Sequence, residues 1–302
     1  MTKQKNESAI LPGALVSFPV GRTRLDGFWR SAEPRRKTLL IYVHGMHGRF
    51  YGSRMKDEIL GLADRGFADV LSFNNRGTGE AVATERFADA RADLDAAIQF
   101  GRCQGYCRFI LAGHSTGCQK GLYYLDRTRN PDVRGLILLA PCDDYAITRH
   151  ELGRRYSLRV RTARERVASG KGEERMPSDC RSFSARRFLS VADRAQTEAS
   201  LFDYDGPMRA WRRLQTPTLV LFGTREEYAV LTPREMIRRL AGSAATPDFE
   251  SVLLRGADHG FHGRERETAE EIALWCSART GGRLLGSSVG SGDGENAGRG
   301  GG

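Results

Sequence analysis

The stretch FILAGHSTGCQKGLYYL, residues 109–125, decides the fold. An apolar run ends in Gly113-His114-Ser115-Thr116-Gly117 and changes at once into a helical pattern. Gly-x-Ser-x-Gly between a strand and a helix is typical of the nucleophile elbow, a strained turn whose glycines let the strand and the helix pack closely. Such a turn exposes the hydroxyl at the carboxyl end of a parallel sheet, where sites of α/β proteins lie. The pattern predicts a nucleophilic serine; a glycine turn that only links two elements is the alternative.

Outward from this stretch, strand patterns and helix patterns alternate. Apolar runs predict buried strands at residues 38–45, 67–73, 107–114, 133–141, 216–223 and 249–256, and helical spacing predicts helices at 51–66, 86–102, 115–128, 232–242 and 264–279. Continuous apolar strands that alternate with helices indicate a mostly parallel, doubly wound sheet covered on both faces, which is the α/β class. Residues 13–30 alternate around Gly21 instead and predict an antiparallel hairpin at the sheet edge.

One interval, residues 142–215, contains no strand pattern and is rich in arginine. Because it lies between two predicted core strands, we expect it to form a helical lid, with residues 154–177 mostly helical. The predicted organisation is an N-terminal extension at residues 1–12, a domain at 13–280 with the lid inserted at about 142–215, and a tail at 281–302. The Gly/Ser-rich composition of the tail predicts disorder.

A serine hydroxyl is a weak nucleophile and needs a base, which in turn is oriented by an acid. Around a nucleophile elbow the chain order is serine, acid, histidine. The histidine is expected after the last strand, where GADHGFHGRE (residues 256–265) offers His259 and His262. We prefer His259 as the base because it follows the strand-ending turn directly, and we interpret His262 as a surface or supporting residue.

The acid is expected after the strand at residues 216–223. The segment TREEYAV, residues 224–230, offers Glu226 and Glu227 there. Glu226 is the preferred acid, and Asp143 and Asp144, which follow the preceding strand, are the alternative.

Two backbone N–H groups are predicted to form an oxyanion hole. Thr116 follows the nucleophile, and Met46 follows the His44-Gly45 turn after the strand at residues 38–45. A glycine turn with histidines in structural hydrogen bonds is the alternative for this loop. His114 is expected to face away from the site in a structural role.

The composition excludes several other classes. No apolar run approaches the roughly 20 residues of a membrane span, and the first ten residues lack a secretory apolar region, so we expect a cytoplasmic protein. The six cysteines do not have the spacing of a zinc site and predict buried free thiols. No motif implies a metal or an organic cofactor. The net charge of +10 comes with no nucleic-acid-binding motif, so no nucleic-acid partner is expected.

These motifs resemble the α/β-hydrolase superfamily over nearly the whole ordered length of the chain. The elbow GHSTGCQ is similar to a group that includes fungal enzymes hydrolysing ester bonds in hydroxamate siderophores. ASGKGEERMP, SARRFLSV and LFDYD resemble the lid of that group, and GADHGFHGRE resembles its histidine loop. The resemblance implies Ser115 as nucleophile and His259 as base. The group usually has aspartate where Glu226 stands here, before a Glu-Tyr pair.

The sequence therefore predicts a serine hydrolase that cleaves a carboxylic ester, or a related acyl bond, through an acyl-enzyme on Ser115. An acyltransferase or thioesterase with the same triad, and a non-catalytic binding protein with a hydrolase fold, are the alternatives. The arginines of residues 142–215 favour a small substrate with negative charge near the scissile ester. Paired, solvent-facing arginines are the other interpretation of that segment.

Overall fold

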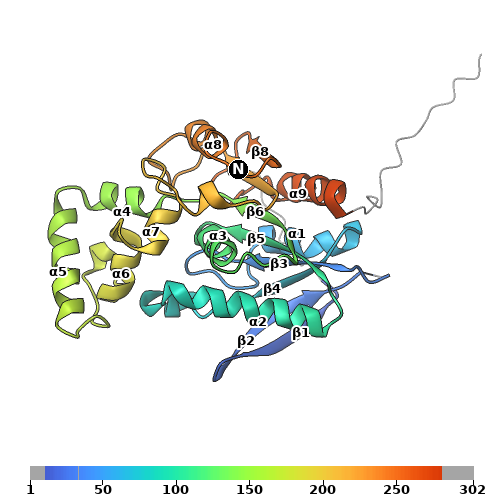
Figure 1. Ribbon diagram of the computed structural model, residues 1–302, viewed down its shortest axis with the longest axis horizontal. Coiled ribbons are helices and arrows are strands. Elements are labelled where there is room, and N and C mark those ends of the chain that lie inside the picture. Colours follow the sequence, from blue (N-terminus) through green and yellow to red (C-terminus); the bar gives the residue numbers. More distant parts are fainter. Residues whose placement is uncertain (1–10, 33, 281–302) are drawn as a thin grey trace, which may run out of the picture.

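The computed structural model describes residues 11–32 and 34–280. Most of the predicted N-terminal extension (residues 1–10) and the predicted tail (residues 281–302) lie outside the described residues. In this part of the chain eight strands form a single sheet in the order β1-β2-β4-β3-β5-β6-β7-β8 (Figure 1). The strands are β1 Ala14–Val20, β2 Thr23–Arg30, β3 Thr38–Val43, β4 Asp69–Phe73, β5 Arg108–His114, β6 Val133–Leu139, β7 Thr218–Gly223 and β8 Phe249–Leu254.

The N-terminal strands form the predicted antiparallel hairpin at one edge, and β2 continues antiparallel onto β4. All pairings from β4 to β8 are parallel. Parallel neighbours need crossover connections, which the helices provide. The prediction of a mostly parallel α/β sheet with an antiparallel N-terminal hairpin is confirmed.

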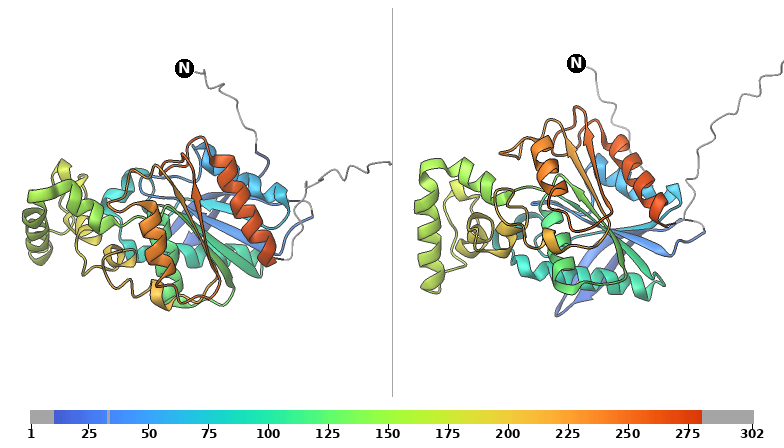
Figure 2. Two further views of the ribbon diagram at one scale, coloured as in Figure 1. Left: turned by 90° about the horizontal axis from the view of Figure 1, so that it is seen from above. Right: turned by 45° about the horizontal axis from the view of Figure 1, so that its top comes forward.

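Helices cover both faces of the sheet (Figures 1 and 2). One face carries α1 and α9, which pack on each other, and the other carries α2 and α3, which also pack on each other. The helices of the described chain are α1 Arg54–Gly61, α2 Ala90–Cys103, α3 Thr116–Thr128, α4 Asp144–Leu152, α5 Tyr156–Ala168, α6 Ala185–Ala192, α7 Thr197–Leu201, α8 Pro233–Ala241 and α9 Glu265–Thr280.

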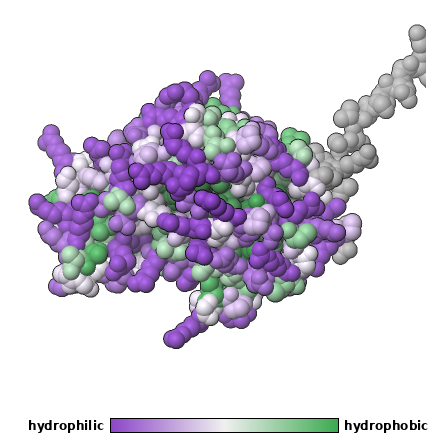
Figure 3. All heavy atoms as spheres, viewed as in Figure 1, coloured by the Kyte–Doolittle hydropathy of each residue, from purple (hydrophilic) through white to green (hydrophobic). Residues whose placement is uncertain are grey.

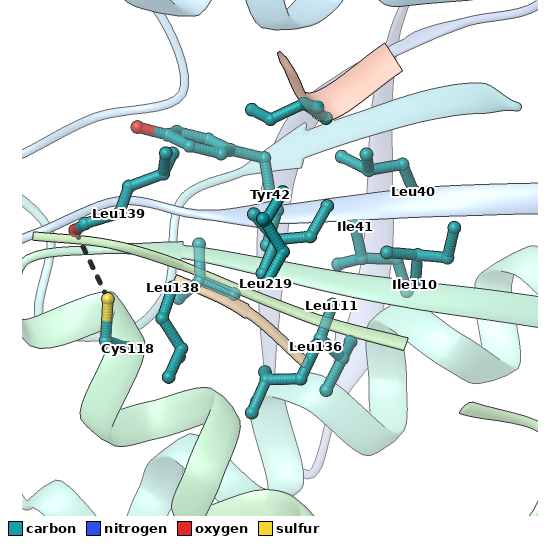
Figure 4. Packing of buried hydrophobic residues seen from close by; sticks show 14 of the residues in the cluster. Leu40, Ile41, Tyr42, Ile110, Leu111, Cys118, Leu136, Leu138, Leu139 and Leu219 are labelled. Carbon is teal, nitrogen blue, oxygen red and sulfur yellow. Dashed lines mark hydrogen bonds between the residues drawn. The ribbon is translucent and has the colours of Figure 1, made fainter. Parts of the chain in front are cut away.

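The main core lies between the central strands and these helices. Leu40, Ile41, Ile110, Leu111 and Leu136 are no more than 2% exposed and pack side by side along β3, β5 and β6 (Figure 4). At the end of this core the thiol of Cys118, in α3, donates to the backbone oxygen of Leu139 (Figure 4). This bond ties the helix that follows the elbow to the neighbouring strand.

Helices α4 to α7 project from the carboxyl end of the sheet (Figures 1 and 2). They enclose a second apolar cluster of their own, which includes Leu152, Val160, Phe183 and Phe188. The expected helix over residues 154–177 is too long: α5 ends at Ala168, and a Ser-Gly turn and an irregular segment follow because Gly170 has a φ of 80°. Charged and polar side chains cover much of the face seen in Figure 3, including these helices. None of the helices in the described residues is long and apolar enough to cross a membrane.

Candidate active site

Ser115 lies in the turn between β5 and α3 with φ 55° and ψ −125°. The left-handed region is strained for a residue with a side chain, and such strain is found at functional sites. The two flanking glycines are required by close contact. A Cβ on Gly113 would lie 2.4 Å from the carbonyl carbon of Gly117, and a Cβ on Gly117 would lie 2.2 Å from the backbone oxygen of Val43. The backbone geometry is therefore that of a nucleophile elbow, with the serine held at its apex.

His259 lies in the loop after β8 and contacts the loop after β7. Its Nδ1 donates to Oε1 of Glu226 over 2.7 Å, since a carboxylate can only accept. The side chain of Glu226 is 1% exposed, whereas Glu227 is exposed and uses Oε2 to accept from the backbone N–H of His259 over 2.9 Å. The structure thus brings both glutamates to His259: Glu226 to the ring and Glu227 to the backbone.

Cys142 lies where the serine and the histidine approach each other. Its sulfur is 3.5 Å from Oγ of Ser115 and 3.9 Å from Nε2 of His259. Within the described residues no hydrogen bond joins Ser115 directly to His259. Burial raises the pKa of the Cys142 thiol, so the sulfur is protonated near neutral pH. Sequence reasoning missed this residue; the only signal was its place three residues after Leu139, which ends β6, in a turn where Ala140 has a φ of 51°.

The loop after β3 lies directly beside the elbow. In the register of the sheet Val43 pairs with Gly113, and a Cβ on Gly45 would lie 2.8 Å from that of Ser115. The N–H groups of Met46 and Thr116 make no backbone hydrogen bond among the described residues. Both residues line the same cavity as Ser115, so both amides are available to an oxygen atom there.

His44 stabilises this loop through hydrogen bonds of its buried ring. Its Nδ1 donates to the backbone oxygen of Gly45 over 2.8 Å, and Nε2 lies 3.3 Å from the amide nitrogen of Asn75. Burial, followed by the charge of Lys120, lowers the pKa of His44 to about 3, which keeps the ring neutral. This pattern fits a neutral ring that donates at one nitrogen and accepts at the other.

His114 does not face away from the site as expected. It lines the cavity, and its Nε2 lies 2.8 Å from the backbone oxygen of His259, with the two rings 5.0 Å apart. His262 is 75% exposed and contacts Asp258.

These groups surround a cavity of about 460 Å³. Its walls include Met46 and Met55 on one side and Ile147 and Arg181 on the side of the lid segment. A cavity of this size, with a few convergent polar groups on apolar walls, suits a small molecule.

Comparisons with known proteins agree with this fold. Residues 40–271 match the model of the alpha/beta hydrolase family. The chain belongs to the alpha/beta hydrolase family. As an α/β hydrolase it shares its fold with Est1E from Butyrivibrio proteoclasticus (14% identity, TM-score 0.65), with 88% of this chain and 98% of the other covered. The siderophore hydrolase EstB from Aspergillus fumigatus is similar at 18% identity and a TM-score of 0.64, with coverage of 91% and 99%. A monoacylglycerol lipase from Paleococcus ferrophilus is similar at 18% and 0.59, with coverage of 89% and 99%. No curated protein matches the sequence.

Part of the positive charge of the lid faces the cavity of this α/β hydrolase. Of the twelve arginines between residues 149 and 194, the cavity is lined by Arg181, which also donates to Glu151 over 2.8 Å. Others bind lid carboxylates, for example Arg159 with Asp179 over 2.9 Å. The lid arginines therefore mostly serve ion pairs within the lid. Lys56 of α1, which the sequence did not single out, also lines the cavity.

A buried chain of polar groups in this α/β hydrolase runs from the loop after β4, which contacts His44, to α6 and α7. Lys120 donates to Oδ1 of Asn75 over 3.1 Å and pairs with Glu85 over 2.6 Å. Glu85 also lies 3.4 Å from Arg187 of α6, which binds Glu198 of α7. All four charged side chains are at most 6% exposed. Burial alone would raise the pKa of Glu85, but Lys120 and Arg187 lower it, so the chain alternates in charge.

Proposed function

We propose that this α/β hydrolase cleaves a carboxylic ester through an acyl-enzyme on Ser115. The observation that carries the proposal is the hydrogen bond from His259 to the buried Glu226, at the rim of the cavity that holds the Ser115 elbow. In this mechanism Ser115 attacks the ester carbonyl while His259 takes its proton at Nε2, and Glu226 stabilises the resulting imidazolium. The backbone amides of Met46 and Thr116 stabilise the oxyanion.

The remaining steps release the alcohol, hydrolyse the acyl-enzyme and regenerate the free serine. The protonated His259 gives its proton to the leaving alcohol, and the acyl group stays on Ser115. Water, deprotonated by His259, then attacks the acyl-enzyme and releases the acid. Attack of Ser115 needs its hydroxyl to turn from the sulfur of Cys142 to Nε2 of His259. Apo geometries of catalytic hydrogen bonds are often long, so the contacts with Cys142 are compatible with this step.

The substrate is proposed to be a small ester. The volume of the cavity and the esterases and lipase among the similar folds support this choice, and the similarity to the siderophore hydrolase EstB makes siderophore esters reasonable test substrates. Negative charge on the substrate is supported by Lys56 and Arg181 alone, because the other lid arginines of the described chain do not line the cavity. A cytoplasmic location is also proposed, supported by six cysteines that form no disulfide in the described residues.

Covalent labelling followed by an ester panel tests the proposal. A fluorophosphonate should add once per chain, and peptide mapping should place the adduct on Ser115. Ser115→Ala should fold with the same far-ultraviolet circular dichroism but take no label and hydrolyse no p-nitrophenyl ester. Equal labelling of the alanine variant would overturn the assignment. An added alcohol acceptor that captures most of the acyl group would instead identify an acyltransferase.

A further inference from the structure

Asp144 is a buried carboxyl group that the proposed reaction does not use. It is the first residue of α4, is 6% exposed, and lines the same cavity as Ser115. Its Oδ2 accepts from Nε2 of Gln119 over 2.9 Å, whereas Oδ1 has no hydrogen bond among the described residues. The aspartate therefore offers an unused acceptor at the wall of the cavity.

Gln119 explains why the carboxyl group is held there. It is the last residue of the GHSTGCQ motif, is 1% exposed, and donates from the same Nε2 to the backbone oxygen of Cys142 over 3.0 Å. These two bonds connect α3 to the turn that follows β6. They fix Asp144 relative to Cys142, whose sulfur contacts the Ser115 hydroxyl. The elbow motif thus positions a carboxyl group as well as a serine.

Asp144 forms no ion pair with a cation of the described chain, although the charges of Arg181 and Arg187 partly lower its pKa. The two nearby arginines are already bound: Arg181 to Glu151, and Arg187 to Glu198. Burial, and then the charge of Glu198, raises the pKa of Asp144 to about 7. Oδ1 is open to the cavity, so a ligand that covers it without donating a hydrogen bond would leave a buried acceptor unsatisfied, which is costly.

We propose that Asp144 is a specificity residue whose Oδ1 accepts a hydrogen bond from a hydroxyl or amino group of the substrate. The inference rests on the proposed function, because it names the class of ester that the Ser115 site prefers. An ester with such a donor would satisfy the carboxyl group, whereas an ester with a methyl group in its place would bury it unpaired. Sites built to bond a donor reject analogues that lack it.

Two panels of esters test the proposal. In one, p-nitrophenyl acyl esters of two to six carbons end in a hydroxyl, an amino or a methyl group; in the other, the same three groups end the alcohol. For at least one chain length, the parent enzyme should show a kcat/KM about 10- to 100-fold higher for a donor ester than for its methyl analogue. Asp144→Ala should bring that ratio close to one, because it removes the acceptor that favours the donor ester.

Asp143→Asn is the matched control. The neighbouring Asp143 accepts from the N–H groups of Ala146 and Tyr204, over 2.8 and 3.1 Å, and does not line the cavity. This variant should lose stability in urea unfolding but keep the parent ratio of donor to methyl esters.

The outcomes separate the two proposals. No preference for donor esters in the parent enzyme overturns the role of Asp144, as does an equal loss on donor and methyl esters in Asp144→Ala. In either case, phosphonylation of Ser115 and turnover of the methyl esters leave the proposed hydrolase standing. Absence of both labelling and turnover across the panels overturns the hydrolase and the subsite together.

Discussion

Oε1 of Glu226 lies 2.7 Å from Nδ1 of His259, and the same oxygen accepts from the N–H of Tyr228 over 2.9 Å. The carboxylate is thereby fixed by its own loop while it fixes the tautomer of the histidine. This arrangement leaves Nε2 without a proton and free to accept one from a serine.

Replacement of this carboxylate should be far more damaging than replacement of its neighbour. Glu226→Gln loses the charge that stabilises the imidazolium, so we expect kcat to fall by about 10³- to 10⁴-fold. Glu227→Gln keeps an oxygen that can accept from the backbone of His259, so we expect a fall of less than about 10-fold. Pre-steady-state release of p-nitrophenol measures both. A larger effect at Glu227 would move the acid by one residue, and small effects at both would favour Asp143 or Asp144.

The thiol of Cys142 should be inert although it contacts both Ser115 and His259. Burial raises the pKa of this thiol, and a protonated thiol is a poor nucleophile. We expect iodoacetamide at pH 7.5 to alkylate the exposed Cys103 and Cys107 and to leave Cys142 and the esterase rate unchanged. Peptide mass mapping provides the measurement. Alkylation of Cys142 with matching loss of activity would show that the thiol is activated by the histidine.

The buried chain that contains Lys120 should make a large contribution to stability. Lys120→Met leaves the carboxylate of Glu85 with Arg187, which Glu198 already neutralises, so we expect a loss of about 3–5 kcal/mol in urea unfolding. The double variant Lys120→Met/Glu85→Gln restores the balance of charge and should lose less than the single one. Arg161→Ala, which breaks an exposed pair with Glu165 at 3.9 Å, is the control and should change little. A double variant with a lower free energy of unfolding than Lys120→Met would contradict the pairing.

The stability of Asp144→Asn relative to the parent should depend on pH. The ordinary pKa of an aspartate is 3.8, and burial raises that of Asp144 to about 7. The folded parent therefore binds a proton that the unfolded chain does not bind between these values, and it gains stability as pH falls through this window.

We expect the asparagine variant to be more stable than the parent at pH 8 and to lose this advantage by pH 4. The slope should not exceed about 1.4 kcal/mol per pH unit. Equilibrium urea unfolding from pH 8 to 4 measures it. A difference between the two proteins that stays constant across this range would show that Asp144 is ionised in the folded state throughout.

The fold and the ends of the strands could be predicted because their signals are local. Ser115 is flanked by two glycines at positions where the close contacts leave no room for a side chain. His259 and Glu226 each follow a strand that the apolar pattern of the sequence predicts. Cys142 and Asp144 could not be assigned, because the direction of their side chains depends on the turn after β6 and on a bond to Gln119.

The positions of charges were harder to predict. Lys120 falls within a helical pattern, where a lysine usually faces solvent, and its partner Glu85 lies 35 residues away in sequence. Their pairing depends on how α3 lies against the loop that carries Glu85, and this loop also lies next to Arg187 of α6. The alternative of paired lid arginines holds for several of them, because carboxylates such as Asp179 and Asp193 lie within reach, and the sequence does not show which arginines these carboxylates bind.

The ionic chain from Lys120 to Glu198 also bears on how the enzyme handles its substrate. Because α6 and α7 contribute Arg187 and Glu198, swinging them away from the sheet would separate these charges from Lys120 and Glu85. We therefore expect these ion pairs to oppose the opening of this part of the lid during each turnover. We also expect the cavity to keep its size during turnover, and substrates to be selected by their fit rather than by closure of the lid. If no lid motion limits the rate, we expect kcat to be insensitive to solvent viscosity.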